Sequence, residues 1–101
     1  MRTTYGVIWQ EGAGPLARGK LELLPLTLHL EGLAGSTPVQ RELAYAELDA
    51  VRVARTSADR LNGHPTLLLE PHHGNRIILA SAAQAGVVAE LTERLAKLTV
   101  G

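Results

Sequence analysis

The sequence predicts a mainly β domain that ends in one helix, and three observations support this prediction. Short apolar runs, several of them alternating with polar residues, are separated by turns rich in Gly, Pro and Asn. The last part of the chain repeats apolar residues at helical spacing instead. The 101 residues are 46 % hydrophobic and 20 % charged, with zero formal net charge. Such a composition suits one folded domain rather than a disordered chain.

Seven strands are expected from the apolar runs and the turns between them. The clearest period-two pattern begins at Leu26 and ends at Glu31, so Leu26, Leu28 and Leu30 are expected to face the core. The other runs are rich in β-branched or aliphatic residues, which strands favour. The predicted strands cover residues 4–10, 16–24, 26–31, 39–45, 48–55, 66–70 and 76–80.

The turns between these strands follow from the positions of Gly and Pro. Gly19 lies inside the second strand and predicts a bulge or a tight bend. Pro25 ends that strand, and residues 32–38 are expected to form a loop because they are rich in Gly, Ser, Thr and Pro. Residues 56–65 form the longest irregular stretch, and residues 71–75 connect the last hairpin.

One amphipathic helix is predicted over residues 82–98. Ser81 is a candidate N-cap, and Gln84 stands at the position of its capping-box partner. The apolar residues recur every three or four positions, which places them on one face of the helix. This face consists of Val87, Val88, Leu91, Leu95 and Leu98.

These elements suggest a specific architecture. Strands joined by short turns are antiparallel neighbours. A single helix cannot cover both faces of a flat sheet, but it can close the open end of two packed antiparallel sheets. The sequence therefore predicts one domain over residues 1–101, built as a bent seven-stranded antiparallel sheet or partly open barrel that helix 82–98 caps.

This order of elements resembles the pleckstrin-homology-like fold, in particular its GRAM-type and bacterial members. The resemblance covers nearly the whole chain and is carried by residues 19–30, by residues 43–53 and by the last hairpin leading into the helix. The helix lacks the Trp common there in eukaryotic members, and Trp9 lies in the first strand instead. This argues against the eukaryotic type and leaves the bacterial type. The resemblance implies a binding domain rather than an enzyme.

The residue types present argue against several kinds of chemistry. The chain has no Cys, so a thiolate metal site, a redox site and a disulfide scaffold are excluded. No Ser stands in a nucleophile-elbow motif, and the four His residues lack the spacing of a ligand set. Zero net charge argues against nucleic-acid binding. We therefore expect no enzymatic activity, no metal and no cofactor.

Basic residues are the best candidates for ligand contacts, although a solvated charged face is the more common explanation for such residues. Ligand contacts are expected on residues 12–15 and 56–65, since longer loops often carry function and two arginines can hold a carboxylate or phosphate. The candidates share a position on or beside the second and fifth strands. They are Arg18, Lys20, Arg52, Arg55 and Arg60.

The function that follows is a non-catalytic binding or scaffolding domain for a protein or peptide partner, held at an open sheet edge or in a groove between loops. The alternative is binding of an anionic ligand or phospholipid surface through the basic residues. The sequence shows no signal peptide and no apolar run long enough to cross a membrane, so a cytoplasmic location is expected. Its many aliphatic residues are compatible with a homo-oligomer.

Overall fold

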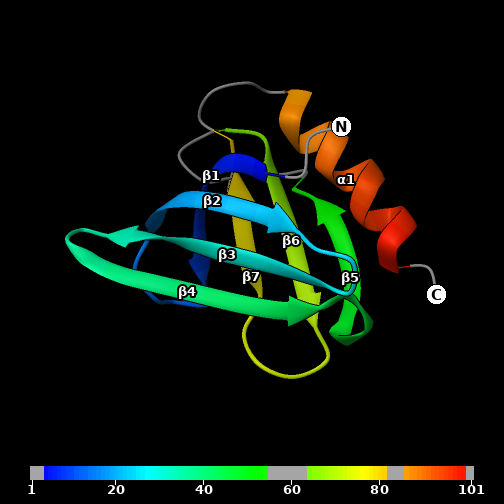
Figure 1. The fold of residues 1–101 in the computed structure, drawn as a ribbon, viewed down its shortest axis with the longest axis horizontal. Coiled ribbons are helices and arrows are strands. Elements are labelled where there is room, and N and C mark those ends of the chain that lie inside the picture. The colour runs from blue at the N-terminus through cyan, green and yellow to red at the C-terminus, as the bar shows by residue number, and fades with distance from the viewer. Residues whose placement is uncertain (1–3, 55–63, 82–85, 100–101) are drawn as a thin grey trace.

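Seven strands of the computed structural model form a single curled antiparallel sheet, and one helix packs at its side (Figure 1). The structure describes residues 4–54, 64–81 and 86–99. The strand order is β4-β3-β2-β1-β7-β6-β5, and every pairing is antiparallel. The elements are β1 (Thr4–Glu11), β2 (Ala17–Leu23), β3 (Thr27–Ala34), β4 (Thr37–Ala44), the short 3-10 helix η1 (Tyr45–Glu47), β5 (Leu48–Val53), β6 (Thr66–Pro71), β7 (Ile77–Ala80) and α1 (Gly86–Thr99). The predicted fold class is confirmed.

The core lies inside the curl of the sheet, where alternate residues of each strand point. Leu28 and Leu30 are fully buried, as their alternation predicts. Each such side chain removed from water stabilises the fold by about 2 kcal/mol. Because the chain has no Phe, many medium-sized aliphatic contacts build the core. Its fully buried aliphatic residues include Leu21, Leu28, Leu30, Leu67, Leu69, Ile77, Leu79, Leu91 and Leu95.

Helix α1 covers the side of the curled sheet next to β5, against which it packs mainly. Val87, Val88, Leu91 and Leu95 are buried on it, as the helical spacing predicts. Leu98 follows at the same helical spacing but is 38 % exposed. It lies in the last turn, at the rim of the core. The predicted start of the helix at residue 82 and the capping partner Gln84 lie outside the described residues.

A polar contact also joins the helix to the sheet. The Arg94 guanidinium donates a hydrogen bond to the Tyr5 hydroxyl oxygen, with 3.0 Å between Nη1 and Oη. Tyr5 is only 2 % exposed, and this burial raises the pKa of its hydroxyl above the ordinary value. The contact joins α1 to β1 through two residues that are 89 positions apart in the chain.

Three details of the sheet differ from the prediction. Residues 32–38 are not a loop, because β3 and β4 continue to a two-residue turn in which Gly35 has a φ of 66°. Leu26 does not face the core: it is 79 % exposed, because β3 begins at Thr27 and Leu26 lies in the preceding turn. Gly19 marks no bulge, since the register on both sides of it is regular. The irregular register lies between Leu48 and Ala50 instead.

Candidate functional site

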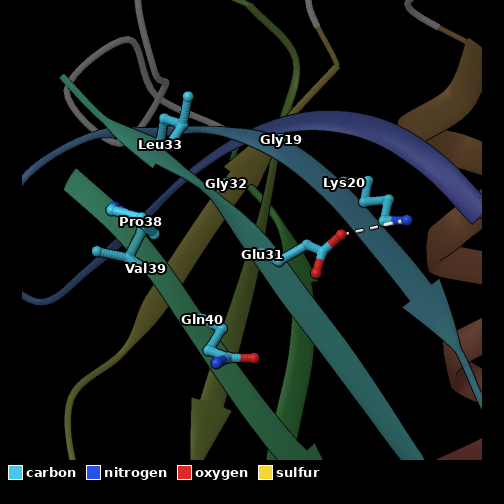
Figure 2. Close-up of a pocket in the computed structure, with 8 residues that line it drawn as sticks. All are labelled: Gly19, Lys20, Glu31, Gly32, Leu33, Pro38, Val39 and Gln40. Atoms are coloured by element: carbon cyan, nitrogen blue, oxygen red, sulfur yellow. Dashed lines mark ion pairs between the residues drawn. The ribbon is translucent and has the colours of Figure 1, made fainter. Parts of the chain in front are cut away.

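A shallow hollow crosses the outer face of β2, β3 and β4, with a volume of about 570 Å³. In Figure 2 these strands lie in front of the second half of the sheet, so the hollow faces away from the core. We call it the outer groove. It is lined by Gly19, Lys20, Glu31, Gly32, Leu33, Pro38, Val39 and Gln40.

The outer groove follows from the register of the three strands. Gly19 pairs with Gly32, which pairs with Val39, and this row turns its side-chain positions toward the core. The rows before and after it point outward. One is the apolar pair Leu33 and Pro38, and the other joins Lys20, Glu31 and Gln40. The groove therefore has a floor of backbone, one apolar wall and one polar wall.

The two glycines are required because the strands approach each other closely. A Cβ atom on Gly19 would lie 1.9 Å from the carbonyl oxygen of Glu31, and one on Gly32 would lie 2.5 Å from that of Arg18. The same Glu31 oxygen accepts a hydrogen bond from Trp9, with 3.3 Å between Nε1 and O. A side chain at position 19 would therefore also displace the acceptor of the buried indole.

The polar wall carries a surface ion pair. Lys20 Nζ lies 3.1 Å from Glu31 Oε1, and His29 Nε2 lies 3.5 Å from the other carboxylate oxygen. The hydrogen bond and charge of Lys20 hold the pKa of Glu31 below its ordinary value, with a smaller contribution from His29. Both side chains of the main pair are about half exposed, so a ligand can reach them.

A second hollow of about 540 Å³ lies at the end of the curled sheet, between the β1–β2 loop and β4. We call it the mouth pocket. Its loop is held by hydrogen bonds from the Gly12 amide to the Arg76 carbonyl and from the Gly14 amide to the Glu11 carbonyl. Val39 and Gln40 line both hollows, so the two lie on either side of β4. The mouth pocket is lined by Trp9, Glu11, Ala13, Gly14, Pro15, Val39, Gln40 and Asn75.

The shared strand β4 is an end strand of the sheet, so alternate backbone groups face away from β3. Ala34 and Thr37 close a two-residue turn, and such a closing pair exchanges both hydrogen bonds. Counting along the strand, the backbone groups of Pro38, Gln40 and Glu42 then point off the free edge. The 3.0 Å hydrogen bond from Arg41 Nη1 to the Glu42 carbonyl oxygen agrees with this assignment.

The free edge is partly blocked. Pro38 has no N–H to donate. Arg41 occupies the Glu42 carbonyl and also binds the Glu11 carboxylate, with 3.0 Å between Nε and Oε2. In this stretch Gln40 therefore has both its N–H and its C=O facing outward. Neither group has a hydrogen-bond partner among the described residues.

The structure brings some of the predicted basic residues together and separates others. Arg18 and Lys20 are exposed on the outer face of β2, beside or within the outer groove. Arg52 lies on β5 and pairs with Glu70, and three strands separate β5 from β2. Arg55 and Arg60 lie outside the described residues. Whether any of the five binds a ligand stays a prediction.

Sequence reasoning missed the apolar wall and the glycine floor, because it assigned residues 32–38 to a loop. A signal was present: Gly19 and Gly32 each stand inside a run of strand-forming residues, where a glycine often marks close backbone approach. Of the loops predicted to contact ligand, residues 13–15 do line the mouth pocket. Most of the second loop, residues 56–65, lies outside the described part of the chain.

Among the described residues, no group of three or more His, Cys, Asp and Glu side chains is placed to hold a metal ion. In the same part of the chain, no helix is long and apolar enough to span a membrane. The expectations of no metal, no cofactor and no enzymatic activity stay predictions.

Comparison with known proteins supports the fold. A C-terminal domain of an unknown protein from Leishmania infantum shares 15 % identity at a TM-score of 0.67, over 92 % of this chain and 81 % of that one. The Slm1 PH domain in complex with phosphoserine shares 21 % identity at 0.65, over 97 % and 94 %. A second Slm1 PH structure, described as binding ligand in a non-canonical site, shares 17 % at 0.64, over 95 % and 94 %.

No family model matches the chain, and no curated protein matches it. The structural similarity nevertheless covers nearly the whole length of both chains. The chain therefore has a pleckstrin-homology-like fold, as the sequence predicts.

Proposed function

We propose that this pleckstrin-homology-like domain is a non-catalytic binding module that recognises a peptide segment of a partner protein. The observation that carries the proposal is the outer groove, where Leu33 is 51 % exposed beside Pro38 over a floor of glycine backbone. Exposed apolar side chains that line a hollow are typical of protein-binding surfaces. Neighbouring polar groups supply the directional contacts that such sites use.

The charge distribution favours a peptide over a strongly anionic surface. Two of the basic candidates are already paired with acids, Lys20 with Glu31 and Arg52 with Glu70. The chain has no net charge, so its long-range attraction for an anionic membrane is weak. An apolar side chain against Leu33 gains from burial whatever the salt concentration.

The test is selection of a phage-displayed library of random dodecapeptides on the whole chain, followed by affinity measurement on the enriched peptides. Leu33→Ser should weaken binding at least tenfold. Leu26→Ser is the matched control, because Leu26 is 79 % exposed but lies outside both hollows. The proposal fails if no peptide is enriched, or if both variants bind as the wild type does.

Anion binding is the second candidate function, and the Slm1 PH domain captured with phosphoserine favours it. On this chain Arg18 and Lys20 would supply the cationic groups, with Arg52, Arg55 and Arg60 as the further candidates. Titration with free phosphoserine, followed by amide NMR shifts, checks a small anionic ligand. Co-sedimentation with phosphatidylserine vesicles at low and high salt checks a membrane surface. In either assay, Arg18→Ala with Lys20→Ala should remove the binding.

A further inference from the structure

Gln40 lies on the free edge of β4 and lines both hollows, so its position restricts the conformation of a ligand that reaches both. We propose that an extended peptide segment crosses the edge there, pairs with the backbone of Gln40 alone, and places two consecutive apolar side chains in the two hollows. The inference rests on the proposed function and specifies its ligand.

The backbone of Gln40 is suited to a single pairing event. Its N–H and C=O face off the edge, so one peptide residue can exchange two hydrogen bonds with it. Longer pairing is blocked toward the turn, since Pro38 lacks a donor. In the other direction, the Arg41 guanidinium occupies the Glu42 carbonyl oxygen. The edge therefore accepts a β-bridge rather than a full additional strand.

The alternation of an extended chain then selects two apolar neighbours. Successive side chains of a peptide beside β4 point to opposite faces of the sheet. One side chain turns to the outer groove, where Leu33 and Pro38 form the apolar wall. The next turns to the mouth pocket, where Trp9 and Pro15 form an apolar lining. Both hollows exceed 500 Å³ and are open enough to admit a large aliphatic or aromatic side chain.

The same features argue against a second copy of this chain as the occupant. Two β4 strands related by a two-fold axis at Gln40 would set each Pro38 opposite the Glu42 of the other copy. The Pro would offer no donor, and the Glu42 carbonyl is already bound by Arg41. A short segment gains its remaining binding energy from the hollows and does not need these groups.

The experiment uses the dodecapeptides enriched on the wild-type chain. Gln40→Pro removes the outward N–H, and the fold should accept it because Pro38 already stands at an equivalent edge position. Gln40→Ala is the matched control, since it removes the side chain and keeps the backbone. We expect the enriched peptides to share two adjacent apolar residues. Gln40→Pro should bind the enriched peptides at least tenfold more weakly than Gln40→Ala, in which only the side chain of the polar wall is lost.

Three outcomes separate this inference from the proposed function. If Leu33→Ser removes binding but Gln40→Pro does not, the edge pairing is overturned and a peptide-binding groove remains. Binding insensitive to both changes, or no enrichment, would overturn both. If the wild-type chain forms a dimer and the Gln40→Pro variant does not, the edge binds a second copy of the chain and the inference is overturned.

A measurement on the peptide keeps the inference testable if the Gln40→Pro chain does not fold. N-methylation removes one peptide N–H at a time while the protein stays wild type. Pairing with a single residue predicts that one N-methylated position loses at least tenfold in affinity, while positions outside the apolar pair lose little. A uniform or absent effect along the peptide would contradict the pairing.

Discussion

The two end strands of the sheet deal with their unpaired edges in different ways. On the β5 side, α1 packs along the sheet and buries Leu91 and Leu95 completely. On the β4 side no described element adds to the sheet, and single residues limit the edge instead. Pro38 removes a donor and Arg41 occupies an acceptor. The apolar core thus extends to α1 on the β5 side, while the β4 edge remains accessible to a ligand.

The largest expected effect comes from breaking the helix-covered side. Leu91→Asp places a charge where Leu91 is fully buried within the apolar cluster. We expect a loss of about 4 kcal/mol or more, which removes most of the stability of a domain this size. Thermal unfolding followed by circular dichroism measures it. Ala89→Asp, on the exposed face of α1, should change stability by less than about 1 kcal/mol. Equal melting temperatures would contradict the packing of α1.

A smaller loss is expected in the floor of the outer groove. The Cβ of Gly19→Ala would meet backbone atoms of Glu31 and Gly32 at 1.9 and 2.4 Å, and backbone cannot rotate away. We expect a loss of about 2–3 kcal/mol in urea unfolding, together with a shifted indole N–H signal of Trp9. Gly6→Ala in β1 is the matched control, because its Cβ would meet nothing within 4 Å. A Gly19→Ala chain as stable as that control would refute the close approach.

Composition and the alternation of apolar with polar residues predicted the buried core better than the exposed β4 edge. Leu28 and Leu30 were predictable because burial on one face imposes a strict period of two. Residues 32–38 were not, because Gly, Ser, Thr and Pro mark loops in general. Here Pro38 is tolerated in a strand, since its nitrogen points off the edge. The position of this edge depends on the pairing of β3 with β4, which no single strand reveals.

The same difference explains what sequence reasoning achieved for the candidate site. Arg18 and Lys20 were identified on an exposed face because charges alternate with small residues along β2. Leu33 belongs to the same surface but was placed in a loop. Its exposure follows from the cross-strand row that it forms with Arg18 and Pro38. Such a row exists only once the three strands have paired, so the sequence of one strand does not reveal it.

The third prediction concerns the β4 edge. Pro38→Ala restores a donor, and Arg41→Gln frees the Glu42 carbonyl oxygen, so the double variant offers a longer edge for pairing between copies. We expect its self-association constant to rise at least tenfold, measured by sedimentation equilibrium. Pro25→Ala with Arg18→Gln makes the same residue changes away from the edge and should leave association unchanged. If the edge variant associates no more than this control, Pro38 and Arg41 do not protect the edge.

The smallest effect is expected at the Lys20–Glu31 pair on the wall of the outer groove. Lys20 lowers the pKa of Glu31, so the pair stabilises the folded state above the unfolded carboxyl pKa of about 4.3 and this contribution is lost as the pH falls through the lowered value. Because both groups are exposed, we expect no measurable change in melting temperature in Lys20→Met. The pKa of Glu31, followed by carboxyl carbon NMR, should nevertheless rise. His29→Gln should raise it less, because His29 is the weaker of the two causes, and Lys97→Met on α1 should not move it. A Glu31 pKa that does not respond to Lys20→Met would show that the ion pair does not persist in solution, and Lys20 would then be free to bind an anionic group in the groove.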